Sequence, residues 1–292
     1  MNKFYIQIVL FLLSISIYVN NKTLATEPDP EENTKTESNK PYFTSEEIYE
    51  KNKNLLCTNP EEIKQAEELM KEAVTQLEHH IKSKGGYKVF KQSPHYDIIF
   101  YRKELDEKTN IQRIDFPYFH NNEYDEIINM LWDPALAKYF NGASVKRKFV
   151  RVYNPNLVII QQRYKSWFEG REKYFYALAA KAQISEKKTI IAMTSANIND
   201  GYPSNKEYEN KIIENANLFK TSINSEDDIR NGKLKKMFVN IAGYIVEKTS
   251  DHTKITYLES LDGHTSNSQK LFIETILNKF FNYQNNKLYL YS

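Results

Sequence analysis

Apolar residues recur with a helical period near both ends of the chain. Asn59 and Pro60 suit the N-cap and the first position of a helix, and Gly85-Gly86 suit its end. Between them the apolar positions are three and four apart: Ile63, Ala66, Met70, Ala73, Leu77 and Ile81. Residues 266–284 repeat the pattern in two adjacent rows: Phe272, Ile276 and Phe280, and Ile273, Leu277 and Phe281. We therefore predict two helices, each with one apolar face.

Between these helices the sequence breaks into short runs rich in β-branched and aromatic residues. Strands are predicted at residues 87–92, 96–105, 111–119, 145–153, 156–167, 173–184 and 188–197, and a two-stranded hairpin at 243–263. A helix over 122–140, bent or divided by Pro134, separates the third strand from the fourth. Short links between strands favour an antiparallel sheet, and about nine strands favour a curved one. The predicted class is α+β, with a long C-terminal helix held by a curved antiparallel sheet.

Several predicted strands carry polar residues on faces that are otherwise apolar. In the hairpin, Glu259 shares a face with Ile255, Tyr257 and Leu261. Buried polar groups without hydrogen bonds cost about 1–3 kcal/mol each. A wet or ligand-filled cavity would satisfy them, and so would a sheet half exposed to water. We predict one inward face for each of two neighbouring strands: Val158, Ile160, Gln162 and Tyr164 in the first, and Tyr174 and Tyr176 in the second.

The chain of 292 residues divides into three predicted parts. A basic start, an apolar run at 4–19 and a small Ala25 are typical of a signal peptide, predicted at 1–25. Residues 26–58, rich in Pro, Glu, Thr and Asn, are expected to be a disordered linker, and 59–292 a single domain. Residues 198–236 look like a polar, irregular insertion with a short helix near 206–219. We expect a monomer that is secreted or exported, and a host cell is one destination that this allows.

Composition and motifs remove several classes of function. The net charge of +2 gives no electrostatic case for nucleic acid binding. One cysteine, Cys57, rules out an internal disulfide and a thiolate cluster, and adjacent His79 and His80 point to different sides of their helix, so no metal site is predicted. No glycine-rich phosphate loop occurs. The basic runs at 146–148 and 233–236 are typical of solvated surface, and either suits contact with anionic lipid.

Residues 59–290 resemble a START domain, the lipid-binding module named for steroidogenic acute regulatory protein. "LWDPALAKYF" at 131–140 resembles that family's Trp-Asp segment, and "REKYFYAL" at 171–178 its Arg-Asp-aromatic motif. The hairpin at 243–263 resembles the one that precedes the family's last helix. The apolar start, acidic linker and Lys/Asn-rich composition further resemble the fam-a family of malaria parasites. The resemblance implies a helix-grip fold whose sheet and C-terminal helix enclose one phospholipid, phosphatidylcholine above all, in an internal tunnel. It also implies a non-enzymatic carrier without a cofactor that moves this lipid between membranes.

The resemblance and the predicted faces together give a set of candidate lipid-binding residues. Asp133 follows Trp132 as in the family, but Asn129 stands where phosphatidylcholine-binding relatives have an arginine, and Glu172 follows Arg171 where they have aspartate. Asp133 therefore either faces the choline ammonium or caps a turn. Trp167 and Phe168, beside cations, are expected to form a loop that contacts the membrane. The expected lipid-binding residues are Asn129, Asp133, Val158, Ile160, Gln162, Tyr164, Tyr174, Tyr176, Met193, Tyr244, Tyr257, Phe272, Ile276 and Phe280.

Two other functions stay open from the sequence. An interaction protein would act through the insertion at 198–236, because long insertions between strands are often functional. An enzyme of the wider helix-grip superfamily would need an acid–base pair in the cavity, for which Asp133, Glu259 and the tyrosines are the candidates. A continuous tunnel favours the carrier, and a compact pocket favours the enzyme.

Overall fold

A computed structural model describes residues 43–83, 85–93, 98–106, 109–118, 124–136, 145–165, 170–204 and 208–262. Its helices are α2 (Ser45–Lys51), η1 (Lys53–Leu55), α3 (Pro60–Lys82), α4 (Tyr124–Trp132), η3 (Pro134–Leu136), α6 (Asn215–Leu218) and α7 (Asp227–Arg230). Its strands are β1 (Lys88–Ser93), β2 (Ile98–Glu104), β3 (Asn110–Tyr118), β4 (Lys146–Asn154), β5 (Leu157–Tyr164), β6 (Lys173–Ser185), β7 (Lys188–Thr194), β8 (Asn197–Asn199), β9 (Lys220–Ser222), β10 (Lys235–Lys236), β11 (Phe238–Lys248) and β12 (Thr253–Asp262).

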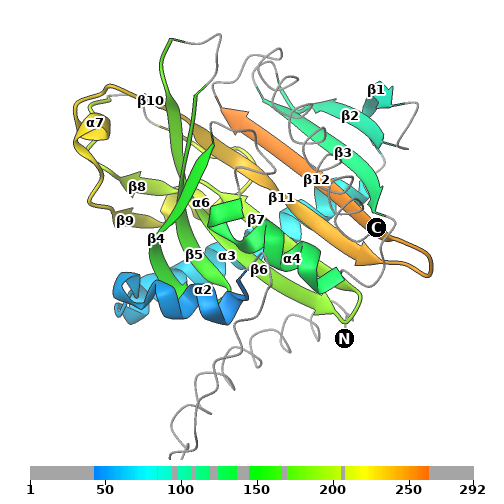
Figure 1. The fold of residues 1–292 in the computed structure, drawn as a ribbon. Coiled ribbons are helices and arrows are strands. Elements are labelled where there is room, and N and C mark those ends of the chain that lie inside the picture. Colours follow the sequence, from blue (N-terminus) through cyan, green and yellow to red (C-terminus); the bar gives the residue numbers. More distant parts are fainter. Residues whose placement is uncertain are drawn as a thin grey trace, which may run out of the picture.

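Nine strands form one antiparallel path, in the order β1-β2-β3-β12-β11-β7-β6-β5-β4 (Figure 1). The last hairpin, β11 and β12, therefore lies in the middle of the sheet and pairs with β3 on one side and β7 on the other. The short β10 joins the sheet by pairing parallel to β6. The predicted α+β class, the antiparallel sheet and its number of strands are confirmed.

Two separate apolar layers cover the two faces of this sheet, with α3 behind it and α4 in front (Figure 1). We call them the α3 face and the α4 face. The α3 helix follows its predicted pattern: the Asn59 side chain accepts from the amides of Glu61 and Glu62, and the apolar stripe is buried on the sheet. The α4 face buries α4, Ile48 of α2 and the inward side chains of the central strands.

The helix α3 approaches the sheet closely at Gly243 in β11. A Cβ atom placed there would lie 2.2 Å from the carbonyl oxygen of Ile191 and 2.7 Å from Cδ2 of Leu77. Real Cβ atoms do not approach other atoms so closely, because repulsion rises steeply at these distances. Glycine is therefore needed for α3 to seat its Leu77 on the sheet.

The linker expected at 26–58 ends earlier than predicted. Residues 45–55 form α2 and η1, and Thr44 and Glu47 make a capping box at the start of α2. Ile48 is 3% exposed and packs in the α4 face. One buried apolar residue in a seven-residue helix gives no periodicity, which is why the composition was misleading. Residues 26–42 lie outside the described residues, as does the signal peptide expected at 1–25.

The segment expected to be an irregular insertion at 198–236 is instead packed against the sheet. It contains β8, β9, β10 and two four-residue helices. Its apolar side chains Ile213, Phe219, Ile229 and Leu234 are buried in the α3 face. The helix near 206–219 reduces to α6, whereas the expected break at Pro134 is confirmed, since α4 ends at Trp132. In the described ranges we find no helix long and apolar enough to cross a membrane.

Candidate functional site

The register between β5 and β6 decides which predicted residues share a face. Gln162 pairs with Phe175, and Gln161 with Tyr176. Directly paired residues of an antiparallel ladder lie on the same face. Val158, Ile160 and Tyr164 belong to the α4 face, but Tyr174 and Tyr176 belong to the α3 face. Placing both sets on one inward face was therefore wrong by one residue in β6, because the sequence does not fix how the strands are offset.

Tyr174 and Tyr176 are used in structural contacts on the α3 face. The Tyr174 hydroxyl donates a hydrogen bond to Asp200 at 2.9 Å, and Gln161 donates to the Tyr176 hydroxyl at 2.6 Å. Burial raises the pKa of both tyrosines. These two rings connect the sheet to the segment at 198–236 and do not reach the α4 face.

Asp133 also has structural partners. It is 3% exposed, its Oδ1 accepts from the amide of Ala135 at 2.8 Å, and its Oδ2 accepts from the amide of Phe43 at 3.3 Å. Asp133 therefore caps η3 and holds Phe43, the first described residue, by a hydrogen bond. Of the two roles considered for it, facing a choline ammonium or capping a turn, the structure shows the cap. Asn129 lies one turn earlier, and its carbonyl oxygen accepts from the Asp133 amide at 2.9 Å.

Five polar side chains meet within the otherwise apolar α4 face, and we call this group the polar pocket. It consists of Arg147 from β4, Gln162 from β5, Tyr244 from β11, and Tyr257 and Glu259 from β12. They surround a cavity of about 20 Å³, room for about one water molecule. The apolar side of the cavity is lined by Phe175, Met193, Val239, Ala242 and Leu261.

Two short contacts organise the polar pocket. The Nε of Arg147 donates to Oε1 of Gln162 at 2.8 Å, and the Tyr257 hydroxyl donates to Oε2 of Glu259 at 2.7 Å. The rings of Tyr244 and Tyr257 lie 4.8 Å apart between centroids, tilted by 39°. Oε1 of Glu259 is buried without a hydrogen-bond partner. A group that enters the pocket therefore finds a guanidinium, two aromatic rings and a free carboxyl oxygen.

The polar pocket contains a positively charged guanidinium, that of Arg147, and a carboxyl group, that of Glu259, whose burial favours the neutral form. Burial raises the pKa of Glu259 to about 7, although the hydrogen bond from Tyr257 opposes this. Burial lowers the pKa of Arg147, but arginine stays protonated in proteins. Arg147 forms no ion pair with another residue that the structure describes. An uncompensated, half-buried guanidinium favours an anionic ligand group, because burying an unpaired charge is costly.

Sequence reasoning found part of this pocket. Gln162, Met193, Tyr244 and Tyr257 were expected to line the ligand and do lie on the α4 face. Arg147 was missed because it sits in the basic run at 146–148, which looks like surface. Strand alternation does carry a signal for it: Arg147 shares parity with the buried Phe149, whereas Lys146 and Lys148 are exposed on the other face. Glu259 showed the same signal, a charged residue between Tyr257 and Leu261.

The geometry can be compared with known proteins. No protein-family model and no curated protein matches the sequence. Human StAR-related lipid transfer protein 5 superposes with a TM-score of 0.54 at 10% identity, over 74% of this chain and 93% of that chain. The chain has the START fold. Human STARD10 superposes with a TM-score of 0.48 at 11% identity, over 74% of this chain and 82% of that chain, and we base the fold on the first structure.

The strand order of this chain places the late hairpin, which resembles START domains in sequence, in the middle of the sheet. Gly243 pairs with Leu258 and Lys248 with Thr253. This places Tyr257 and Glu259 at the centre of the sheet, facing the layer that contains α4. The expected C-terminal helix with Phe272, Ile276 and Phe280, and the loop with Trp167 and Phe168, lie outside the described residues. The expected tunnel would have that helix as one of its walls, so it also lies outside the described residues.

We find no cluster of His, Cys, Asp and Glu side chains suited to a metal ion in the ranges that the structure describes. Among the described residues, the functional candidates are the polar pocket and the apolar side chains that line its cavity. The chemistry that these groups offer is recognition of a ligand with a polar, charged end and an apolar body.

Proposed function

We propose that this protein binds one lipid molecule against the α4 face and carries it between membranes. The observation that supports this most strongly is the polar pocket within an apolar layer. Its unpaired Arg147 and partnerless Glu259 oxygen would be unfavourable in a simple core, since each unsatisfied buried group costs about 1–3 kcal/mol. The START fold adds the analogy with a structure whose name describes lipid transfer.

The cargo that suits the pocket best is a phospholipid, with phosphatidylcholine as the specific proposal. Arg147 offers the donors for a phosphate group. A quaternary ammonium cannot donate hydrogen bonds, so aromatic faces and a carboxylate hold it, and Tyr244, Tyr257 and Glu259 are those groups. These residues replace Asp133, Tyr174 and Tyr176 as headgroup candidates. The acyl chains would leave water for apolar surface, a gain of about 0.8 kcal/mol for each CH₂ group.

A cavity of about 20 Å³ cannot hold a lipid, so cargo binding requires movement of what covers the α4 face. We propose the C-terminal helix and the loop with Trp167 and Phe168 as that cover. The apolar segment at 4–19 and the resemblance to fam-a support a secreted or exported carrier.

A second candidate function follows from Glu259. A buried carboxyl group with a pKa of about 7, hydrogen-bonded to a tyrosine, is suited to general acid–base catalysis. The compact size of the polar pocket favours a small reacting group there.

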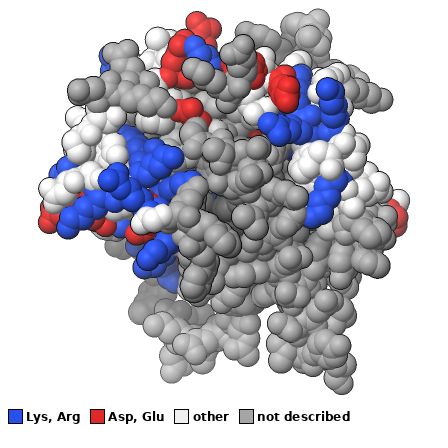
Figure 2. All heavy atoms as spheres, turned by 90° about the horizontal axis from the view of Figure 1, so that it is seen from above, with Lys and Arg blue, Asp and Glu red and all other residues white. Residues whose placement is uncertain are grey.

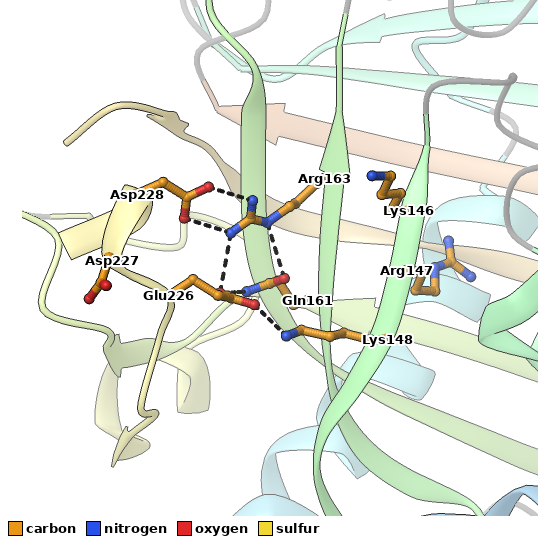
Figure 3. Close-up of a pocket in the computed structure, with 8 residues that line it drawn as sticks. All are labelled: Lys146, Arg147, Lys148, Gln161, Arg163, Glu226, Asp227 and Asp228. Carbon is orange, nitrogen blue, oxygen red and sulfur yellow. Dashed lines mark hydrogen bonds and ion pairs between the residues drawn. The ribbon is translucent and has the colours of Figure 1, made fainter. Parts of the chain in front are cut away.

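Native mass spectrometry of the full chain, purified without detergent and offered dispersed short-chain phosphatidylcholine, tests both functions. We expect one lipid per chain, recovered with unchanged mass, and occupancy reduced at least tenfold by Arg147→Met. Lys148→Met is the matched control, because Lys148 lies on the same strand with its side chain on the opposite face (Figure 3). A protein that takes up no lipid contradicts the carrier, and a lipid recovered with altered mass supports the enzyme.

A further inference from the structure

Basic segments that are far apart in the sequence end at one edge of the sheet. The pairing register places Lys146 of β4 beside Arg163 of β5, Arg163 beside Tyr174 of β6, and Tyr174 beside Lys236 of β10. Neighbouring strands lie about 4.8 Å apart, so this row spans roughly 14 Å. The two basic runs at 146–148 and 233–236, each unremarkable in the sequence, therefore meet at one end of the sheet, with Lys146 and Lys236 on the α3 face and Lys235 on the α4 face.

The segment at 198–236 delivers the second run to this edge through backbone contacts. The Lys233 amide donates to the carbonyl oxygen of Asp228 at 2.9 Å, and the Lys235 amide donates to that of Glu172 at 2.9 Å. The pairing of Lys235 with Lys173 brings two lysines side by side. The run that contains Lys233 and Lys235 is therefore held at this edge by backbone contacts.

The carboxylates that line the neighbouring cleft, Glu226, Asp227 and Asp228, are already paired with cations. In an open cleft of about 440 Å³, Arg163 donates to both oxygens of Asp228, at 2.8 and 2.9 Å, and Lys148 pairs with Glu226 (Figure 3). Four exposed cations remain without an ion pair to another described residue, and we call them the basic end: Lys146, Arg171, Lys233 and Lys235. Lys and Arg side chains gather on the side of the molecule where α7 and β10 lie (Figure 2).

We propose that the basic end docks the protein onto the anionic surface of a membrane. The proposal rests on the proposed function, since lipid exchange requires membrane contact. The basic end adjoins the polar pocket, because Arg147 lies between Lys146 and Lys148 with its side chain on the other face of β4. Docking there places the polar pocket beside the membrane. The net charge of the chain is only +2, whereas nucleic-acid-binding domains are strongly basic. The basic end therefore suits a local contact with a membrane better than binding along a nucleic acid.

Flotation of the full chain with vesicles tests the docking surface. The vesicles contain phosphatidylcholine alone or with about one-third phosphatidylserine, and each cation near such a surface strengthens binding about fivefold, the equivalent of about 1 kcal/mol. We expect Lys233→Gln/Lys235→Gln and, separately, Lys146→Gln/Arg171→Gln to weaken binding to the anionic vesicles about 25-fold. Raising the salt to about 0.5 M should weaken wild-type binding as well. The control, Lys64→Gln/Lys71→Gln, removes two exposed charges from α3. The apolar segment at 4–19 is common to all variants, so its contribution cancels.

The outcomes separate this surface from the proposed function. If both double variants float like the control while their melting temperatures are unchanged, the docking surface is wrong. If the wild-type chain takes up dispersed phosphatidylcholine but does not prefer anionic vesicles, the docking surface is also wrong and the carrier stands. Anionic-vesicle binding that depends on the basic end, without lipid uptake, supports the surface and contradicts the carrier. Dependence on the basic end for binding RNA, and none for vesicles, overturns the membrane assignment.

Discussion

Ionisation of Glu259 should make a destabilising contribution that grows as the pH rises toward 7. Its side chain is 1% exposed, and burial raises its pKa from 4.5 to about 7. Between these values the folded state holds a proton that the unfolded state has lost. The free energy of unfolding therefore decreases with pH across this window and levels off above the folded pKa. The expected loss is about 3 kcal/mol, at about 1.4 kcal/mol for each pKa unit.

The matching perturbation is Glu259→Gln, which keeps the shape of the side chain and removes its charge. Urea unfolding of wild type and variant should be measured from pH 5 to pH 8.5. We expect the two to differ little at pH 5 and the variant to be more stable by about 3 kcal/mol at pH 8.5. His80, whose pKa burial lowers to about 4, makes stability rise with pH up to about 6.5, but it does so in both proteins and cancels in the difference.

A second control and a ligand experiment sharpen the test. Glu104→Gln removes an exposed carboxylate and should leave the pH profile parallel to wild type. If the choline ammonium lies beside Glu259, it favours the ionised carboxylate, so short-chain phosphatidylcholine should bind more tightly at pH 8 than at pH 6. Parallel profiles for wild type and Glu259→Gln would refute the reasoning, because they would mean that Glu259 is ionised, or solvated, throughout the range.

Two further predictions concern the scaffold. Asp133→Ala removes the acceptor for the amides of Ala135 and Phe43, so urea unfolding should show a loss of about 1–3 kcal/mol with lipid uptake unchanged; unchanged stability with lost uptake would restore Asp133 as a headgroup ligand. Gly243→Ala places a methyl group 2.2 Å from the Ile191 carbonyl oxygen and should cost about 3 kcal/mol, whereas Gly85→Ala, with no atom within 4 Å, should cost under about 0.5 kcal/mol in the same assay; equal costs would contradict the close approach of α3.

Hydrophobic periodicity and turn chemistry alone determined much of the fold. The α3 helix, its Asn59 cap, the break at Pro134 and the positions of the main strands were all predictable, because each depends on the pattern of residues close in the chain. The short helix α2 was not, since its single buried side chain, Ile48, becomes apolar core only when the sheet is present. The same holds for the buried residues at 198–236.

Only the tertiary structure decided which side chains meet in the polar pocket. The alternation of side chains along β5 and β6 was visible in the sequence, but the pairing of Gln162 with Phe175 was not. A shift of one residue moves a whole strand to the other face, which is how Tyr174 and Tyr176 were assigned to the wrong layer. Arg147 and Glu259 come from strands at the edge and at the centre of the sheet. Sequence periodicity specifies faces within one strand, whereas the offset between strands is set by packing across the entire sheet.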